Sequence, residues 1–438
     1  MSQLLEVILR GRRSSGRLDL EAVEMATRAA MHRAGAAVLS ELLTSSEAAP
    51  GKVPCGCGKQ APYHDSRPKQ LTTVVGKVCF DRAYYHCAHC RQGRSPRDRE
   101  LDVEGKECSP GVRRMLAAVG SESSFEQGRA QLELLAGLDV TTKAVERHAE
   151  AIGADIAAGE QAEMHRAKQL ELPQVCAPAV PLLYLEMDGT GVPVVAAERA
   201  GRAAKIAGQP ARTREVKLGC VFTQTRVDEQ GRPVRDEAST SYVAAIESAE
   251  EFGLRLYTEA WNRGWSRARK KVVLGDGAVW IWNLADQHFP NAMQIVDLYH
   301  ARQHLWELAS QLFANDPQAR KRWARRLEHK LNRGKLEELV KTLREFPPPN
   351  PELARLLANE AQYFERNTER MRYPQFRAQG LFVGSGVVEA GCKTVVGARL
   401  KQSGMFWTVR GANAILALRC NRLSGKFEDY WESRARAA

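Results

Sequence analysis

The spacing of apolar residues along the chain predicts helices near both ends and a strand-rich region between them. From about Leu20 to Leu43, apolar residues recur with helical spacing, so one amphipathic helix is expected there. The segment KQLTTVVGKVCFDRAYYHC has the pattern of a β-hairpin, with its turn expected at Gly76 and Lys77. The intervening SSEAAPGK is typical of a linker.

A helical region follows, opened by Ser109-Pro-Gly and ending in TTKAVERHAEAIGADIAAG. Its last two helices are joined by a turn at Gly137–Val140, and Thr141 or Thr142 can cap the second. This arrangement is that of a helix-turn-helix motif, and a plain three-helix bundle is the alternative. The candidates for DNA contact on the second helix are Lys143, Arg147 and His148.

The proline-rich segment ELPQVCAPAVP marks the main domain boundary, and short apolar runs alternate with helices after it. Helices are expected near Glu247–Trp261 and at AVWIWNLADQHF, and strands at LLYLEMD, VPVVAA, VKLGCVFTQTRV, KVVLGD and QIVDLYH. Three early strands, a helix and then alternating strands and helices fit a ribonuclease-H-like mixed sheet of the α/β class. From Ala301 to about Phe376 the pattern predicts helices alone, and the C-terminal stretch predicts two helices around Met405-Phe-Trp407.

The charge balance points to an acidic partner. The 438 residues carry a formal net charge of +12, and nucleic acid is the commonest partner of so basic a chain. An ordinary basic protein is the alternative. No apolar run approaches the roughly 20 residues of a membrane helix, and the N-terminus lacks the order of a signal peptide. We therefore expect a cytoplasmic protein, associated with the nucleoid and not with a membrane.

Four of the ten cysteines form two close pairs at the ends of the predicted hairpin. Two such pairs are the plan of a zinc ribbon, because thiolates suit Zn²⁺ and the metal stabilises a segment too small for its own core. The first pair is one residue shorter than the usual Cys-x-x-Cys, so His64, His86 or His89 is an alternative ligand. A reduced set of cysteines without metal is the other interpretation. The predicted zinc ligands are Cys55, Cys57, Cys87 and Cys90.

Three acidic residues far apart in sequence are the candidates for a second metal site. Asp188 and Asp276 each follow a β-favouring run and have glycine neighbours, whereas Glu389 lies early in a helix that Ser385 can cap. Three carboxylates suit a pair of Mg²⁺ ions, with Mn²⁺ as a substitute. Each acid also has a simpler interpretation, as a turn residue, a helix cap or a surface ion pair. The rival acids are Glu186 and Asp286.

Basic residues are concentrated in two C-terminal regions. The segment DPQARKRWARRLEHKLNRGK holds eight Lys and Arg against two acids, with Trp323 inside it and Trp306 upstream. Clustered cations with aromatic residues favour a DNA-facing surface, and a solvated helical face is the alternative. Spacing by four places Glu389, Lys393, Gly397 and Lys401 on one helix face. The expected phosphate contacts are Lys321, Arg322, Arg325, Arg326, Lys393 and Lys401.

The chain contains four motifs, which are EMDGTGVPV, GDGAVWIWNLA, IVDLYHARQHLW and GSGVVEAGCKTVVGARLKQSGMFW. Together they resemble bacterial insertion-sequence transposases with a DDE acid triad, of the ISKra-like family. This family is related to Mutator-like and hAT-like transposases. The resemblance implies that Asp188, Asp276 and Glu389 are the metal-binding triad and that Ala301–Phe376 is a helical insertion. It also implies that Asp297-x-x-His300 is a family signature. Either this pair fixes the start of a helix, or His300 is catalytic and contacts the scissile phosphate or a base.

The expected function is that of a DNA transposase, which cuts transposon ends and joins them to target DNA by two-metal phosphoryl transfer. Double-stranded DNA is the expected partner, and a homo-oligomer is expected because two transposon ends are handled together. The alternatives are a structure-specific nuclease, a DNA-binding regulator without catalysis, and an enzyme of small phosphoesters. The expected segments are 1–50 (helical), 51–106 (zinc-ribbon-like), 107–172 (helix-turn-helix), 173–300 (first part of the core), 301–380 (basic helical insertion) and 381–438 (C-terminal part of the core).

Overall fold

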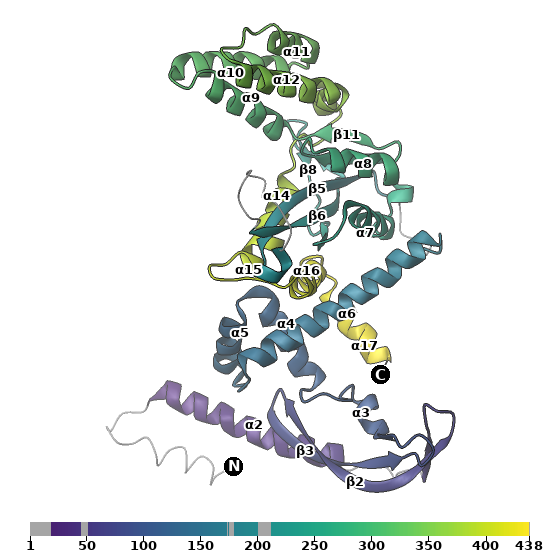
Figure 1. Cartoon of the computed structure of the whole chain (residues 1–438). Coiled ribbons are helices and arrows are strands. Elements are labelled where there is room, and N and C mark those ends of the chain that lie inside the picture. Colours follow the sequence, from purple (N-terminus) through teal and green to yellow (C-terminus); the bar gives the residue numbers. More distant parts are fainter. Residues whose placement is uncertain (1–18, 45–50, 173, 175–178, 200–211, 438) are drawn as a thin grey trace. The chain divides into compact units, whose positions relative to one another are not determined.

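The computed structural model describes all residues except 1–18, 45–50, 173, 175–178, 200–211 and 438 (Figure 1). The two predicted linkers lie partly outside the described residues. The chain forms two compact units, Met1–Ile152 with Phe427–Ala438, and Gly153–Lys426. The division falls inside the long helix α6 (Thr142–Lys168). The six-segment organisation expected from the sequence remains a prediction.

The first unit opens with one helix, α2 (Leu20–Thr44), as its periodicity predicts. This helix contacts β3 of a four-stranded antiparallel sheet. The predicted hairpin is confirmed, but its predicted turn is wrong. Thr73 pairs with Gly76, so the loop is Val74 and Val75, and Gly76 follows with a φ of +110° that favours glycine. The strands are β1 (Lys52–Pro54), β2 (Gln60–Thr73), β3 (Gly76–His86) and β4 (Gly93–Arg94).

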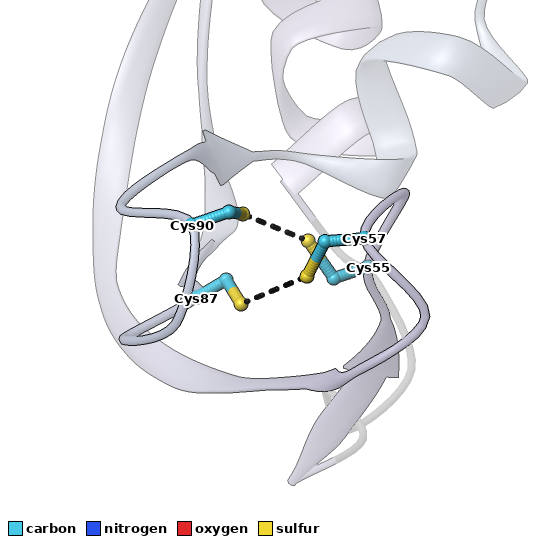
Figure 2. A group of neighbouring side chains, drawn as sticks. All are labelled: Cys55, Cys57, Cys87 and Cys90. Carbon is cyan, nitrogen blue, oxygen red and sulfur yellow. Dashed lines mark hydrogen bonds between the residues drawn. The ribbon is translucent and has the colours of Figure 1, made fainter.

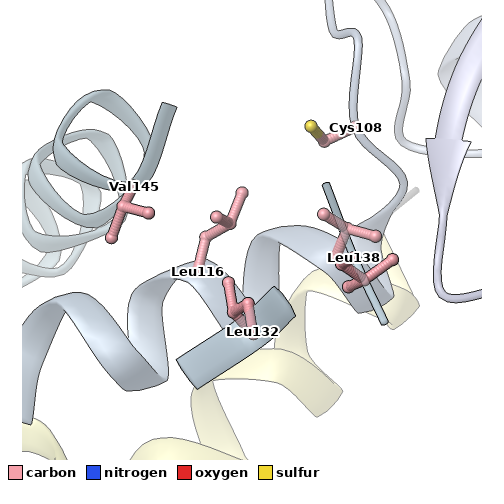
Figure 3. Packing of buried hydrophobic residues seen from close by; sticks show 6 residues of the cluster. Cys108, Leu116, Leu132, Leu138 and Val145 are labelled. Atoms are coloured by element: carbon pink, nitrogen blue, oxygen red, sulfur yellow. The ribbon is translucent and has the colours of Figure 1, made fainter. Parts of the chain in front are cut away.

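The rest of the first unit is largely helical, and the helices after Ser109 and Thr141 begin where the sequence predicts, whereas α3 and α17 are not among the predicted helices. The Ser109 hydroxyl accepts a hydrogen bond from the N–H of Val112, and Thr141 accepts one from Ala144. Buried apolar residues from these helices and their connections form one core, shown in Figure 3. The helices are α3 (Pro96–Glu100), α4 (Pro110–Glu122), α5 (Phe125–Gln131), a π-helical turn (Leu132–Ala136), the start of α6, and α17 (Phe427–Ala437).

The second unit is built on a five-stranded mixed sheet with the order β11-β10-β5-β6-β9. β5 pairs parallel with β10, which pairs parallel with β11, whereas β5, β6 and β9 are antiparallel neighbours. The strands are β5 (Leu182–Pro193), β6 (Thr213–Thr223), β9 (Ser241–Ala245), β10 (Lys270–Gly275) and β11 (Met293–Val296), and a small separate ribbon is formed by β7 (Arg226–Val227) and β8 (Pro233–Val234).

Three strand predictions in this region are wrong in detail. LLYLEMD and VPVVAA are not two strands, because β5 continues through Asp188 and stays paired with β6 as far as Pro193. The three early strands of the sheet are therefore β5, β6 and β9. β6 corresponds to the predicted strand VKLGCVFTQTRV, whereas the sequence pattern does not predict β9. QIVDLYH is a strand only as far as Val296, since Asp297 already caps the next helix.

Helices cover both faces of this sheet. A Cβ on Gly219 of β6 would meet side chains of Leu256 and Phe252, so α7 (Ala249–Asn262) lies on that face, with α8 (Val279–His288) beside it. A Cβ on Gly391 of α14 (Gly386–Gly391) would meet Leu218. Leu218 and Gly219 are consecutive in β6 and point to opposite faces, so α14 covers the other face.

The predicted helical insertion is confirmed as a group of helices, and α9, α10, α11 and α12 pack side by side (Figure 1). The C-terminal helix is not one regular α-helix, because a π-helical segment, Cys392–Gly397, interrupts it. In the described part of the chain, every helix is too short or too polar to cross a lipid bilayer. The remaining helices are α9 (Leu298–Leu312), α10 (Pro317–Asn332), α11 (Leu336–Arg344), α12 (Pro351–Arg366), α13 (Tyr373–Ala378), α15 (Ala398–Leu400) and α16 (Val409–Leu423).

Candidate functional sites

The four predicted zinc ligands lie together, which confirms their clustering (Figure 2). One pair follows β1 and the other follows β3, so the antiparallel sheet brings the two loops face to face. All four sulfur atoms lie within 4.8 Å of one another. The Sγ atoms of Cys55 and Cys90 are 3.4 Å apart, and those of Cys57 and Cys87 are 3.7 Å apart. The three alternative histidines are not members of this group.

The geometry of this cluster fits Zn²⁺. Four thiolates about 2.3 Å from a tetrahedral Zn²⁺ are about 3.8 Å from one another, close to the observed separations. The backbone N–H of Cys90 donates to the sulfur of Cys87 and, with the N–H of His89, lowers the pKa of Cys87 to about 6. Hydrogen bonds from the backbone of Cys57 and from Cys90 also lower the pKa of Cys55. The short first pair is therefore compatible with a four-sulfur site.

Two of the three predicted acids lie next to each other at the junction of β5 and β10. The last registered pair of these parallel strands is Met187 with Gly275, so Asp188 and Asp276 come next on neighbouring strands, which lie about 4.8 Å apart. Burial raises the pKa of Asp276, and the charge of Asp188 raises it further. The strand order reverses at this junction, which is where open α/β sheets bind ligands.

The third acid, Glu389, is carried by α14 on the face of the sheet to which Asp188 points. Glu186 and Asp188 are two residues apart in β5 and share a face. The N–H of Val388 in α14 donates to Glu186 Oε2 at 2.8 Å, and Cys392 Sγ lies 3.4 Å from Asp188 Oδ2. Burial raises the pKa of Glu186, and the charges of Asp297 and Glu389 raise it further. The helix that carries Glu389 therefore packs directly on the strand that carries Asp188.

These acids do not form a closed cage. Among the described residues, the cysteines are the one group that gathers three or more ligand atoms within 4.8 Å, so the oxygens of Asp188, Asp276 and Glu389 do not all lie within that distance of one another. An open arrangement is nevertheless chemically suited to Mg²⁺, which takes oxygen ligands, keeps several waters and uses only one or two carboxylates. The mutual repulsion of Asp188 and Asp276 is what a cation between them would relieve.

Two further carboxyl groups, both completely buried, hold the start of α14. Asp297 Oδ2 accepts hydrogen bonds from the backbone N–H and the hydroxyl of Ser385, and Oδ1 accepts one from the backbone N–H of His300 at 2.8 Å. Glu186 accepts from Val388, and burial raises the pKa of Glu186 to about 8. Asp297 thus fixes the start of α9, which is the simpler of the two interpretations of its motif, and fixes the start of α14 as well.

The other predicted acid and the predicted histidine have different surroundings. Asp286 is exposed on α8 and accepts a hydrogen bond from the side chain of Gln294. His300 is half-buried on the first turn of α9.

Sequence reasoning missed three residues beside Asp276, namely His304 on α9 and Glu360 and Tyr363 on α12. His304 Nδ1 lies 2.9 Å from Glu360 Oε2, and its ring stacks on Tyr363 with centroids 4.2 Å apart. The spacing of His300 and His304 by four residues, which places both on one helix face, is the signal that could have identified the histidine. Glu360 and Tyr363 become neighbours of His304 only because α12 packs on α9.

The four basic residues of the insertion that are predicted to contact DNA are exposed, but the predicted aromatic partner is buried. The four basic residues Lys321, Arg322, Arg325 and Arg326 are exposed on α10. Trp323 is buried and packs against Phe313 and Phe346, so the expectation that it faces DNA is wrong. The helix is amphipathic, and the tryptophan belongs to its buried face.

The second helix of the predicted helix-turn-helix presents two of its three candidate residues. Lys143 and Arg147 are exposed and pair with Glu146 and Glu107. His148 is buried, and burial with the nearby Arg147 and Arg113 lowers its pKa to about 4, so its expected availability is wrong.

The two C-terminal lysines do not share one α-helical face with Glu389, because the π-helical segment changes the spacing. Lys393 is exposed, whereas Lys401 donates a hydrogen bond to Thr190 of β5.

Comparison with known proteins identifies the family of this chain and finds weaker similarity to a curated protein and to a solved structure. Residues 59–434 match the family described as "Uncharacterised protein family (UPF0236)". The "UPF0236 protein in vanSb 3'region" of Streptococcus gallolyticus is 23% identical over 385 residues, which are 83% of this chain and 75% of that protein. Among solved structures, the Drosophila P element transposase strand transfer complex aligns with 69% of this chain and 84% of its own, with 9% identity and a TM-score of 0.20.

Proposed function

The chain belongs to the UPF0236 family, and on that premise we propose that it is a DNA transposase of an insertion sequence, similar to the ISKra-like DDE transposases. The family description assigns no activity, so the proposal depends on the residues of this chain. Its catalytic core is a ribonuclease-H-like fold completed by the helical insertion and the C-terminal helices. The substrates are the two ends of the transposon and the target DNA.

One observation supports the proposal most, which is that the two strands and the helix that carry the three acids are direct neighbours. Asp188 and Asp276 lie side by side at the point where strand order reverses, and α14 brings Glu389 onto the same face. The sheet order, with three antiparallel strands followed by two parallel strands, agrees with the expected ribonuclease-H-like core. The four sequence motifs of the resemblance contain these same acids.

In this proposal Asp188, Asp276 and Glu389 hold Mg²⁺ or Mn²⁺, which would supply charge neutralisation at the scissile phosphate and an activated oxygen nucleophile. The carboxylates bind and orient the ions from three different elements. Buried Asp297 and Glu186 keep α14 in place. His300, on the first turn of α9, faces the site and donates to a phosphate oxygen.

The remaining charged surfaces would bind DNA. The exposed cations of α10 neutralise phosphates without reading the bases, and Lys143 and Arg147 contact DNA from the helix-turn-helix segment. The cysteine cluster binds Zn²⁺ and stabilises the small sheet of the first unit. Because both transposon ends are handled together, the active form is a homo-oligomer on double-stranded DNA.

The test is an assay of a labelled duplex that contains the element's own end, incubated with Mg²⁺ and a target plasmid. The proposal predicts strand cleavage followed by joining of the freed 3′ end to the plasmid. Cleavage without joining would identify a nuclease with the same site. Binding of DNA without any metal-dependent cleavage would identify a non-catalytic regulator and contradict the proposal.

A further inference from the structure

The helical insertion contacts the acid site through one aromatic ring. Gly277 follows Asp276 directly, and a Cβ built on Gly277 would lie 2.1 Å from Cε2 of Tyr363 and 2.7 Å from its Cζ and hydroxyl oxygen. Atoms cannot approach so closely, so the ring occupies the space that any side chain at position 277 would need. Gly277 is not among the glycines with positive φ, so its backbone does not require glycine. The ring of Tyr363 requires it.

Tyr363 is in turn held from its other face. The imidazole of His304 stacks on the phenol ring, with centroids 4.2 Å apart and an interplanar angle of 14°. The Glu360 carboxylate fixes the imidazole, because its two oxygens lie 2.9 and 3.2 Å from His304 Nδ1. Two packed helices, α9 and α12, thus clamp the ring against the loop that carries Asp276.

The charges around this cluster agree with a connection to the acid site. Burial lowers the pKa of His304, but the hydrogen bond and the charge of Glu360, with Glu307 and Asp276 adding to them, raise it above its usual value. Burial and the charge of Asp276 raise the pKa of Tyr363. The Tyr363 hydroxyl is buried and has no hydrogen-bond partner in the part of the chain that is described. Tyr363 therefore acts here through packing and not through a hydrogen bond of its hydroxyl.

We propose that Tyr363, held by the His304–Glu360 pair, is a positioning residue that fixes Asp276 in the metal-binding site. The inference rests on the proposed function and adds to it, because the helical insertion then forms one wall of the catalytic site as well as a DNA-binding surface. Ligand carboxylates depend on such supporting contacts, and their loss typically weakens metal affinity or activity by about 10–100-fold.

A double-mutant cycle between positions 277 and 363 tests this contact. Gly277→Ala should weaken Mn²⁺ binding, measured by electron paramagnetic resonance, by about tenfold or more, because the new methyl group displaces the Asp276 loop. Tyr363→Ala should also weaken binding, because the loop loses its support. In the double variant the methyl group fills space that the ring has left, so its loss should be smaller than the product of the two single losses.

Three further variants separate positioning from a general structural defect. Tyr363→Phe keeps the ring and should retain Mn²⁺ affinity within about threefold. His304→Ala removes the stacked imidazole and should shift affinity in the same direction as Tyr363→Ala. Gly159→Ala is the matched glycine control, because position 159 is exposed on α6 with open space around it, and it should leave Mn²⁺ affinity unchanged.

The outcomes distinguish this inference from the proposed function. Unchanged affinity in Gly277→Ala, or strictly multiplicative losses in the cycle, would overturn the positioning role. Mn²⁺ binding that depends on Asp276 but is never accompanied by DNA cleavage would overturn the proposed function alone. A wild-type protein that binds no Mn²⁺ at the acids would overturn both.

Discussion

Replacement of Asp297 by alanine should release α14 and, with it, Glu389. Asp297 is completely buried and accepts three hydrogen bonds, from the N–H of His300 and from the N–H and hydroxyl of Ser385. The hydroxyl can rotate towards another acceptor, but the two backbone N–H groups cannot. Of these two, only the Ser385 N–H belongs to the start of α14. A buried donor left without a partner costs about 1–3 kcal/mol, so we expect the free energy of opening of α14 to fall by about 2 kcal/mol.

Hydrogen–deuterium exchange of the segment 382–391 measures this loss directly. A change of about 2 kcal/mol in the free energy of opening corresponds to exchange about thirtyfold faster. Asp286→Ala is the matched control, since Asp286 is exposed and makes one side-chain hydrogen bond, and it should leave exchange in this segment unchanged. Exchange in Asp297→Ala within about threefold of wild type would refute the assigned role.

Three other predictions concern the zinc site, the DNA surface and pH. Elemental analysis of freshly purified protein should find about one zinc per chain, removed by a chelator with loss of thermal stability; less than half an equivalent, unaffected by chelation, would contradict the assignment. Replacing the four exposed cations of α10 by alanine should weaken binding to all DNA sequences alike and reduce the slope of log affinity against log salt concentration by about one unit per contact. The control is Lys335→Ala with Lys341→Ala, two exposed lysines already paired with glutamates. An unchanged slope in the α10 variant would refute the prediction. The pKa of His148 is about 4 in the folded protein against its usual 6.5, so the unfolded chain takes up this proton first as the pH falls. The contribution of this residue to the free energy of unfolding is therefore fully present above about pH 6.5 and declines towards pH 4. His148→Gln should flatten that decline in urea titrations, and identical pH profiles of variant and wild type would contradict the prediction.

The sequence predicts best what depends on local spacing. The helix Leu20–Thr44, the capped helices after Ser109 and the cysteine cluster all follow from periodicity, caps or thiol spacing, and the structure confirms them. The prediction that the strand ends at Asp188 is wrong, because the glycines that follow Asp188 do not form a turn. Pairing with β6, a strand distant in sequence, keeps β5 extended through Gly189 and Gly191. Non-local pairing of this kind has no local signal.

The residues that the sequence missed or misplaced are defined by tertiary packing. Trp323 and His148 have basic neighbours in sequence, but each lies on the buried face of an amphipathic helix. Glu186 and Asp297 are completely buried acids whose partners are backbone groups at the start of α14, so no pattern of charges reveals their role. Tyr363 becomes part of the acid site only because α12 packs on α9. These features require the fold before they can be recognised.

The most direct test of the central claim is cleavage of the element's own end by three single variants, Asp188→Ala, Asp276→Ala and Glu389→Ala, in the presence of Mg²⁺. Each variant should lose strand cleavage and joining while DNA affinity is retained, because the basic residues that we propose to bind DNA lie on α6 and α10. Apo stability should hold or rise slightly, since one of a group of mutually repelling carboxylates is removed. Cleavage by Asp276→Ala at the wild-type rate would contradict the metal-triad mechanism.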